Sequence, residues 1–220
     1  MPSNPFVIPF EQLPATLPIF PLPNAIVMPG CHLPLNIFEP RYLDMIFDAL
    51  KENRLIGMVQ PDTSDTNDAH VYGTGTAGRI VSFNEIPDGR LLVVLAGICR
   101  FDIVDEIIQS SRTYRQVVVD WSRFREDYEA SGEEAGFDRS RLMAVLKTYF
   151  ERKGFQTDWS TVEELPALLL VNALAGQLPL DAPEKQALVE AVTAEERIST
   201  FIHLLEFDVA GIDATETTRH

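Results

Sequence analysis

The sequence contains few of the residues that build metal sites. Its 220 residues include two cysteines and four histidines. Cys31 and Cys99 have no CxxC spacing, and none of the histidines belongs to an HxH or HExxH motif; they are His32, His70, His203 and His220. Because a zinc site needs about four such ligands brought together, we predict no metal site and no cofactor.

Basic residues are also scarce. Lysine and arginine number 18, against 33 aspartate and glutamate residues, which gives a net charge of −15. The chain has no cluster of basic residues from which a groove for phosphates could be built. Nucleic acids are bound largely through contacts between basic groups and phosphates, so no nucleic-acid partner is expected.

Long apolar runs are missing as well. The opening stretch MPSNPFVIPFEQLPATL is interrupted by prolines and polar residues and has no basic start, unlike a signal peptide. No later segment reaches the roughly 18 apolar residues that a membrane-spanning helix needs. We therefore expect a soluble, cytoplasmic protein that does not bind membranes.

Short apolar and β-branched runs dominate the first half of the chain. The clearest are the two runs on either side of Pro87, Asp88 and Gly89, where proline presets a turn dihedral and glycine accepts a positive φ. This pattern predicts a β-hairpin, and the glycine-rich YGTGTAG (72–78) predicts a bulge or bend that leads into it. Four shorter runs predict further strands: LPIFPL (17–22), AIVMPG (25–30), RLIGMVQPD (54–62) and YRQVVVDW (114–121).

The stretch LPLNIFEPRY (33–42) predicts a joint between a strand and a helix. Leu33, Leu35 and Ile37 alternate along one face of a strand. Pro40 suits the first turn of a helix and favours an extended conformation for the residue before it. The helix is expected over residues 40–54, with one apolar face formed by Tyr42, Leu43, Ile46, Phe47 and Leu50.

The composition changes after Trp121. SRFREDYEASGEEAGFD (122–138) is polar and acidic, which predicts a solvated connection. Four helices are predicted beyond it. The first carries an apolar stripe and stops at Gly154, and the other three begin at the capping signals Thr161 with Glu164, Asp181, and Thr193 with Glu196. The two stripes are Leu142, Val145, Leu146, Tyr149 and Phe150 in the first helix, and Ile198, Phe201, Ile202 and Leu205 in the last.

The predicted elements define an α+β protein, in which a β pseudo-barrel with one inserted helix precedes a four-helix bundle. The expected segments are an N-terminal arm (1–16), the barrel (17–122), an acidic linker (123–138), the bundle (139–209) and a frayed polar tail (210–220).

Candidates for nucleophilic catalysis are limited to the two cysteines. Cys31 is followed by His32, but neighbours on a strand point to opposite faces. Cys99 could pair with His70, although a cysteine in an apolar run is more often a buried structural residue. No P-loop sequence GxxxxGK[ST] is present. We predict no catalytic residue and no enzyme activity.

Three blocks of the sequence resemble the N-terminal, substrate-binding domain of the ATP-dependent protease Lon. They are LPIFPLPNAIVMPGCHLPLNIFEPRYLDMI (17–46), GTAGRIVSFNEIPDGRLLVVLAGICRFDIVDE (75–106) and ELPALLLVNALAGQLPLDAPEKQALVEAVTAEERISTFIHLL (164–205). The resemblance implies a PUA-like pseudo-barrel joined to a helical bundle. The ATPase and protease modules of full-length Lon have no counterpart in these 220 residues, so peptidase activity is not expected.

The resemblance implies a non-catalytic module that binds proteins, through exposed apolar segments of unfolded chains or on a specific partner. We expect the binding groove between barrel and bundle, and a partner-facing corner at Phe38 and Arg41. Two other functions stay open on the same fold: an enzyme acting on small molecules with a cysteine nucleophile, and RNA binding. The sequence predicts no oligomeric state.

Overall fold

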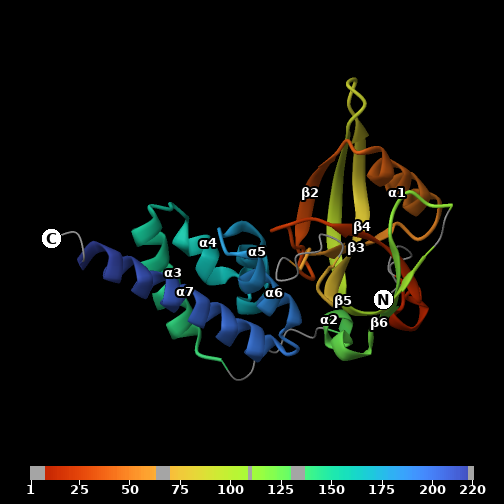
Figure 1. Cartoon of the computed structure of the whole chain (residues 1–220). Coiled ribbons are helices and arrows are strands. Elements are labelled where there is room, and N and C mark those ends of the chain that lie inside the picture. Colours follow the sequence, from red (N-terminus) through yellow and green to blue (C-terminus); the bar gives the residue numbers. More distant parts are fainter. Residues whose placement is uncertain (1–7, 63–69, 109–110, 130–136, 218–220) are drawn as a thin grey trace. The chain divides into compact units, whose positions relative to one another are not determined.

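The computed structural model describes residues 8–62, 70–108, 111–129 and 137–217, with side chains to residue 211. The chain divides into two compact units, residues 1–130 and 131–220. We call them the barrel unit and the helical unit (Figure 1). The boundary between them lies inside the stretch predicted as a connection.

The described part of the barrel unit contains one mixed sheet of six strands. In chain order the strands are β1 (Thr16–Pro21), β2 (His32–Ile37), β3 (Leu55–Val59), β4 (Thr74–Glu85), β5 (Leu91–Ile107) and β6 (Gln116–Asp120). Their order in the sheet is β2-β5-β4-β3-β1-β6, and β6 pairs again with β5. Among the described strands, β1 and β3 pair in parallel and the other pairings are antiparallel. The sheet therefore curls into the expected pseudo-barrel, which is formed by β5, β4, β3, β1 and β6. The strand β2 pairs with β5 and is not one of these five strands.

The hairpin between β4 and β5 has the predicted turn. Gly89 adopts φ +85°, and its N–H donates to the carbonyl of Ile86. The hairpin extends beyond the rest of the sheet (Figure 1). The predicted bulge is confirmed too, because the β4–β5 register shifts between Ala77 and Gly78.

Residues 25–30 are irregular, although an apolar run there predicted a strand. Gly30 adopts φ +79°, and its N–H donates to the carbonyl of Gly97, whose own N–H donates to the carbonyl of Cys31. A Cβ atom on Gly97 would lie 2.2 Å from the carbonyl oxygen of Met28. The apolar side chains of Ile26, Val27 and Met28 are nevertheless buried. The apolar run therefore indicated a buried segment and not a strand.

One helix of the barrel unit, α1 (Pro40–Lys51), covers part of the sheet (Figure 1). Its buried residues are Tyr42, Met45, Ile46 and Ala49. The buried face of α1 differs from the predicted apolar face. Phe47 keeps 43% of its surface exposed, while Leu43 and Leu50 are half-buried at the edge of the core. The strand half of the joint is confirmed: Leu35 and Ile37 are buried and Leu33 is half-buried.

The acidic stretch after Trp121 is folded where the structure describes it. It forms a 3₁₀ turn (Ser122–Phe124) and α2 (Glu126–Glu129). Phe124 is 1% exposed, and the ring of Tyr128 meets that of Phe10 edge-on at 5.8 Å. The prediction of a solvated connection is therefore wrong for these residues, since single apolar side chains anchor a polar segment. Residues 130–136 and the first seven residues of the predicted arm lie outside the described part.

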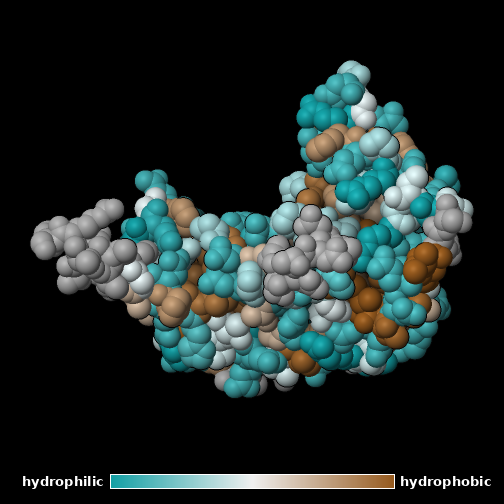
Figure 2. All heavy atoms as spheres, viewed as in Figure 1, coloured by the Kyte–Doolittle hydropathy of each residue, from teal (hydrophilic) through white to brown (hydrophobic). Residues whose placement is uncertain are grey.

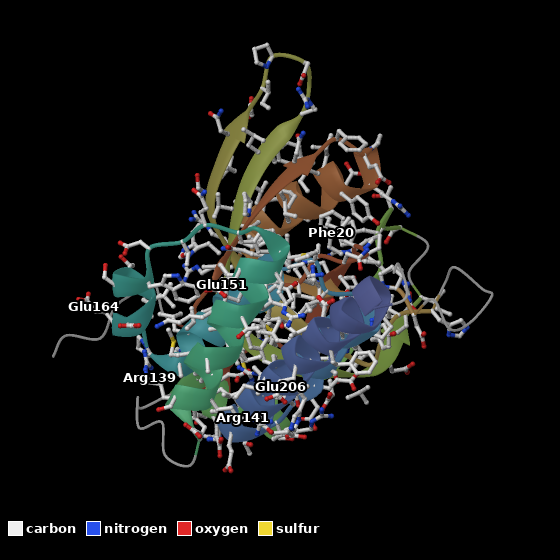
Figure 3. The ribbon with its side chains drawn as sticks, turned by 90° about the vertical axis from the view of Figure 1, so that its left-hand side faces the viewer. Phe20, Arg139, Arg141, Glu151, Glu164 and Glu206 are labelled. Atoms are coloured by element: carbon white, nitrogen blue, oxygen red, sulfur yellow. The ribbon has the colours of Figure 1, made fainter. Side chains whose placement is uncertain are left out.

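The helical unit contains α3 (Arg139–Lys153), α4 (Trp159–Glu164), α5 (Ala167–Gln177), α6 (Ala182–Glu190) and α7 (Ala194–Thr217). The helix α7 packs against α3, α5 and α6. Its predicted stripe is buried, as are four of the five stripe residues of α3. Arg141 of α3 and Glu206 of α7 join the two helices through Nη2–Oε2 and Nε–Oε1 bonds of 2.8 and 3.0 Å (Figure 3).

Two predictions for the helical unit were wrong. Thr161 does not cap a helix: it lies inside the short helix α4, which Asp158 caps, and Pro166 separates α4 from α5. Proline at that position holds Leu165 in an extended conformation. The tail expected to fray continues α7 as far as Thr217; a polar sequence without proline does not by itself end a helix. Residues 218–220 lie outside the described part.

Candidate functional site

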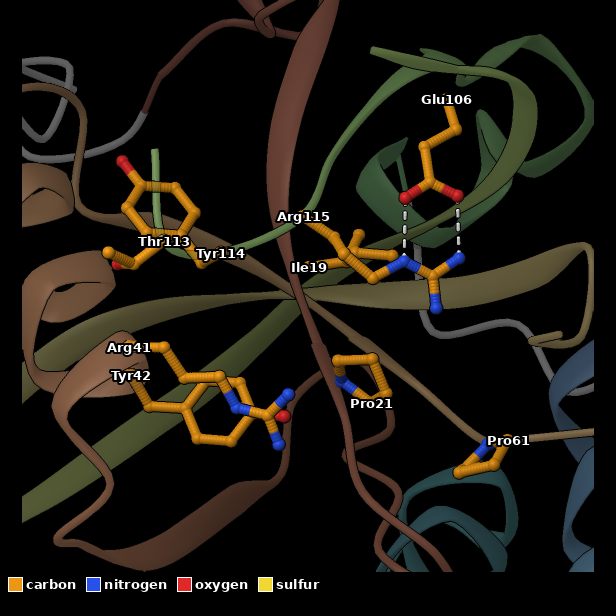
Figure 4. A pocket seen from close by; sticks show the side chains of 9 residues that line it. All are labelled: Ile19, Pro21, Arg41, Tyr42, Pro61, Glu106, Thr113, Tyr114 and Arg115. Atoms are coloured by element: carbon orange, nitrogen blue, oxygen red, sulfur yellow. Dashed lines mark hydrogen bonds and ion pairs between the residues drawn. The ribbon is translucent and has the colours of Figure 1, made fainter. Parts of the chain in front are cut away.

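A pocket of about 500 Å³ opens in the barrel unit beside the first turn of α1. Figure 4 shows the nine side chains that line it, which come from β1, α1, β5 and the two segments before β4 and β6. They are Ile19, Pro21, Arg41, Tyr42, Pro61, Glu106, Thr113, Tyr114 and Arg115. The pocket thus combines apolar walls with two guanidinium groups.

The N-terminus of α1 places Arg41 and Tyr42. Pro40 occupies the first turn after an extended Glu39. Tyr42 points into the core, where its ring centroid lies 4.2 Å from that of Phe20. Arg41 donates from Nε to Glu39 Oε2 at 3.0 Å, and its Cζ lies 4.5 Å from the centroid of the Tyr42 ring. The guanidinium therefore lies over an aromatic ring that lines the pocket.

The opposite wall is an ion pair between Arg115 and Glu106. Nε and Nη2 of Arg115 donate to the two carboxylate oxygens at 2.7 and 2.6 Å (Figure 4). The hydrogen bonds from Arg115 lower the pKa of Glu106 below its usual value. Such a paired, bidentate arrangement fixes the orientation of the guanidinium plane.

A second, more open groove of about 610 Å³ adjoins the pocket and shares Thr113 and Tyr114 with it. Most of its remaining wall is the outer face of α1, with Asp44, Phe47, Asp48, Leu50 and Lys51, and Ser111 and Arg112 complete it. We call the pocket and this groove together the α1 cleft. Figure 2 shows apolar residues among hydrophilic ones on the face of the barrel unit that it displays.

Hydrogen bonds tie the segment before β6 to α1. Thr113 donates from Oγ1 to Asp44 at 2.8 Å, and the hydroxyl of Tyr114 donates to Asp48 at 2.9 Å. Arg112 donates in turn to the Tyr114 oxygen. The bonds from Lys51 and Tyr114 lower the pKa of Asp48. Thr113 and Tyr114, which line both the pocket and the groove, are thus hydrogen-bonded to α1.

The two residues predicted as a partner-facing corner lie differently. Arg41 lines the pocket, and its side chain is 54% exposed. Phe38 is 64% exposed but does not line the α1 cleft. Arg41 forms an ion pair with Glu39, two residues before it in the chain. The corner itself stays a prediction, as does the groove between barrel and bundle.

Four polar or charged residues that line the pocket were not singled out from the sequence: Glu106, Thr113, Tyr114 and Arg115. They come from the end of β5 and the segment before β6, and only the sheet brings them to α1. The antiparallel register places Ile107 opposite Gln116, which sets Glu106 near Arg115. Glu106 and Arg115 are nine residues apart in the chain, but the register that pairs their strands cannot be read from either strand alone.

The cysteine candidates are placed unlike a catalytic pair. Cys99 is fully buried, and its thiol donates weakly to the carbonyls of Arg100 and Phe124. Burial raises the pKa of Cys99 to about 12, with the Asp127 carboxylate adding to the effect. Cys31 is half-buried, next to an exposed His32 at the start of β2. A thiol held in the neutral form is a poor nucleophile.

Among the described residues, no group of three or more His, Cys, Asp or Glu side chains could hold a metal ion. None of the described helices combines the length and the apolar character needed to cross a bilayer.

Together, fold and cleft define an α+β domain in which a curled sheet carries a groove beside the helix α1. Residues 16–206 match the family model of the ATP-dependent protease La (LON) substrate-binding domain, and the chain belongs to that family. The match covers both units.

Related sequences are full-length Lon proteases. The chain is 27% identical over 208 residues to Lon protease of Flavobacterium johnsoniae and 29% identical over 208 residues to Lon protease 2 of Myxococcus xanthus. Each alignment takes in 92% of this chain and 25% of the relative. The chain therefore spans about a quarter of the length of these relatives.

Two solved structures share the fold. A Lon N-terminal domain protein from Xanthomonas campestris superposes with a TM-score of 0.62 at 22% identity, over 86% of this chain and 97% of that one. The N-terminal domain of Mycobacterium avium complex Lon protease gives 0.60 at 17% identity, over 87% and 98%. At these identities the likeness concerns the fold alone.

Proposed function

We propose that the chain is a non-catalytic recognition module that binds polypeptides in the α1 cleft. The family is one of substrate-binding domains, and this membership supports recognition as the general role. The observation that carries the finer proposal is the cleft itself, a two-lobed hollow along one helix with apolar and charged walls. The partners would be proteins or unfolded segments of proteins.

The cleft has the size and mixture of walls that polypeptide side chains require. Its lobes of about 500 and 610 Å³ fall in the range of sites that enclose ligands. Phe47 offers an exposed aromatic ring in the groove, and Pro21 and Pro61 offer apolar surface in the pocket. Exposed aromatic and arginine side chains dominate the energetics of many protein interfaces.

Binding is favoured over the other functions by two observations. The buried thiol of Cys99 has a raised pKa, which disfavours a cysteine nucleophile at neutral pH. The net charge of −15 disfavours contact with RNA phosphates. Neither observation disfavours a polypeptide that lacks a large negative charge.

The proposal is tested by titrating the chain into fluorescently labelled, reduced and carboxamidomethylated α-lactalbumin, an unfolded protein, and following anisotropy. We expect saturable binding. We also expect Phe47→Ala to weaken it about tenfold, the effect of removing a well-packed aromatic contact.

Phe83→Ala is the matched control. Phe83 is 48% exposed, close to the 43% of Phe47, but it lies in the β4–β5 hairpin and does not line the cleft. The variant should bind like the unmodified chain. Equal losses in the two variants, or no saturable binding at all, would contradict the proposal.

A further inference from the structure

The pocket holds two guanidinium groups that each keep one nitrogen outside their ion pair. Arg115 uses Nε and Nη2 for Glu106, and Arg41 uses the same two atoms for Glu39. Among the described residues, Nη1 of each is not part of these ion pairs. Figure 4 shows the guanidinium of Arg41 extending toward Pro21 and the third nitrogen of Arg115 directed to the same part of the pocket.

The surface between these nitrogens is apolar. Pro21 lies between the two arginines in Figure 4, Pro61 lies beyond it at the lower right, and Tyr42 and Ile19 also line the pocket. Proline side chains offer no hydrogen bond, so this surface suits a hydrocarbon group. Tyr42 also lines this pocket, and its hydroxyl is a further donor. Burial raises the pKa of Tyr42, which keeps that hydroxyl a donor at neutral pH.

A ligand that satisfies both features carries an anion with two or more acceptor oxygens next to an apolar group. We propose that the pocket binds a carboxylate attached to an apolar residue, with Arg41 and Arg115 donating from Nη1. Two sources supply this chemistry in a polypeptide: the C-terminal carboxylate after an apolar last residue, and an internal aspartate or glutamate beside apolar residues. This inference rests on the proposed function, because it names the chemical group that a polypeptide would place in the cleft.

The ion pairs with Glu39 and Glu106 assist rather than prevent this binding. They lock each guanidinium plane before the ligand arrives, so less side-chain entropy is lost on binding. They also offset the two positive charges, so the pocket does not select small inorganic anions by charge alone. Specificity then comes from the direction of the remaining donors and from the apolar wall.

The test uses three fluorescein-labelled peptides that share the sequence Gly-Ser-Gly-Ser-Ala-Leu-Phe. One ends in a free acid, one in an amide, and the third carries an amide end with glutamate in place of alanine. Anisotropy titrations should show the free acid binding about tenfold more tightly than the amide, the value of one charge-assisted contact. If glutamate restores tight binding to the amide, a side-chain carboxylate is also accepted; if it does not, the pocket takes the C-terminus.

Arg41→Gln and Arg115→Gln should each abolish the preference for the acid. Arg90→Gln is the control, because the pair of Arg90 with Asp88 has the same spacing and similar exposure as that of Arg41 with Glu39, but lies at the hairpin turn. Arg41 is mostly exposed, so its variant should keep the native melting curve even if that of Arg115 does not.

The failure of this inference differs from the failure of the proposed function. Acid and amide peptides that bind equally, or a preference that survives in Arg41→Gln, overturn the carboxylate pocket. So does the absence of peptide binding by a chain that still binds unfolded α-lactalbumin. If neither the peptides nor unfolded α-lactalbumin bind, both proposals fall.

Discussion

Arg100 and Asp127 form a buried ion pair that fastens the segment after β6 to the middle of β5. Their side chains are 1% and 6% exposed, and the Nε–Oδ2 and Nη2–Oδ1 distances are 2.7 and 2.8 Å. Asp127 also accepts the backbone N–H of Arg100 at 3.0 Å, and the guanidinium lies 4.2 Å from the centre of the Phe124 ring. A short polar segment is thus part of the barrel unit.

Removing one partner should destabilise the barrel unit strongly. Asp127→Ala leaves the Arg100 charge buried without this carboxylate, and we expect a loss of about 3–5 kcal/mol in the free energy of unfolding. Urea denaturation followed by Trp121 fluorescence in a Trp159→Phe background reports on this unit, since each unit holds one tryptophan. Glu11→Gln, which removes an exposed partner of Arg125, should leave the midpoint nearly unchanged. Equal midpoints for the two variants would show that burial of the pair does not matter.

Gly97 is predicted to tolerate no side chain. A Cβ there would lie 2.2 Å from the Met28 carbonyl oxygen, so Gly97→Ala must displace backbone. We expect about 1–3 kcal/mol of destabilisation, the usual cost of overpacking. In Gly73→Ala the new methyl would meet nothing within 4 Å, and urea denaturation of that variant should match the unmodified chain. A urea midpoint for Gly97→Ala equal to that of the unmodified chain would contradict the close contact between Met28 and Gly97 of β5.

The two thiols should react at very different rates. Cys99 is buried with its pKa raised to about 12, whereas Cys31 is half-buried. At pH ~8, near the ordinary pKa of a free cysteine, iodoacetamide should modify Cys31 first and Cys99 only after unfolding. Mass spectrometry of the peptides, with Cys31→Ser as control, measures both rates. Rapid and selective labelling of Cys99 in the folded chain would contradict this prediction and would support a cysteine nucleophile.

The pair of Glu106 and Arg115 should make stability depend on pH in one direction. The pKa of Glu106 is lower in the folded state than in the unfolded state, so its contribution is fully present above the unfolded pKa of roughly 4.3 and is lost as the pH falls through the folded pKa. The melting temperature of Glu106→Gln should therefore lie below that of the unmodified chain at pH ~7 and approach it at pH ~3. A difference that stays constant over this range would contradict the pairing.

Local patterns predicted most of the fold. The hairpin at Gly89, the start of α1 at Pro40 and the end of α3 at Gly154 each depend on a dihedral that a proline or glycine sets. The apolar stripe of α7 was also correct, because both the helical period and the burial are properties of one segment.

The errors arose where distant segments decide the outcome. The run 25–30 is apolar because it is buried over Gly97, not because it pairs as a strand. The stretch from Ser122 to Glu129 is polar in composition, yet Phe124 and Asp127 bury themselves against β5. Phe47 belonged to the apolar pattern of α1 but lies on its exposed side.

The α1 cleft could be predicted only in part. Arg41 was singled out from the joint between β2 and α1, since a strand-to-helix turn presents its side chains. Arg115 and Glu106 meet it through the curl of the sheet, which joins β5 to β6. No local signal marks either residue as part of a site, because each is an ordinary charged residue on a strand end.

The most direct test of the central claim is hydrogen–deuterium exchange of the whole chain with and without saturating carboxamidomethylated α-lactalbumin. If the α1 cleft binds polypeptides, exchange should slow in peptides that cover residues 41–51 and 111–115. The hairpin turn, residues 86–90, should exchange as before. Unchanged exchange along α1 and residues 111–115, with protection elsewhere in the chain, would contradict the cleft as the binding surface.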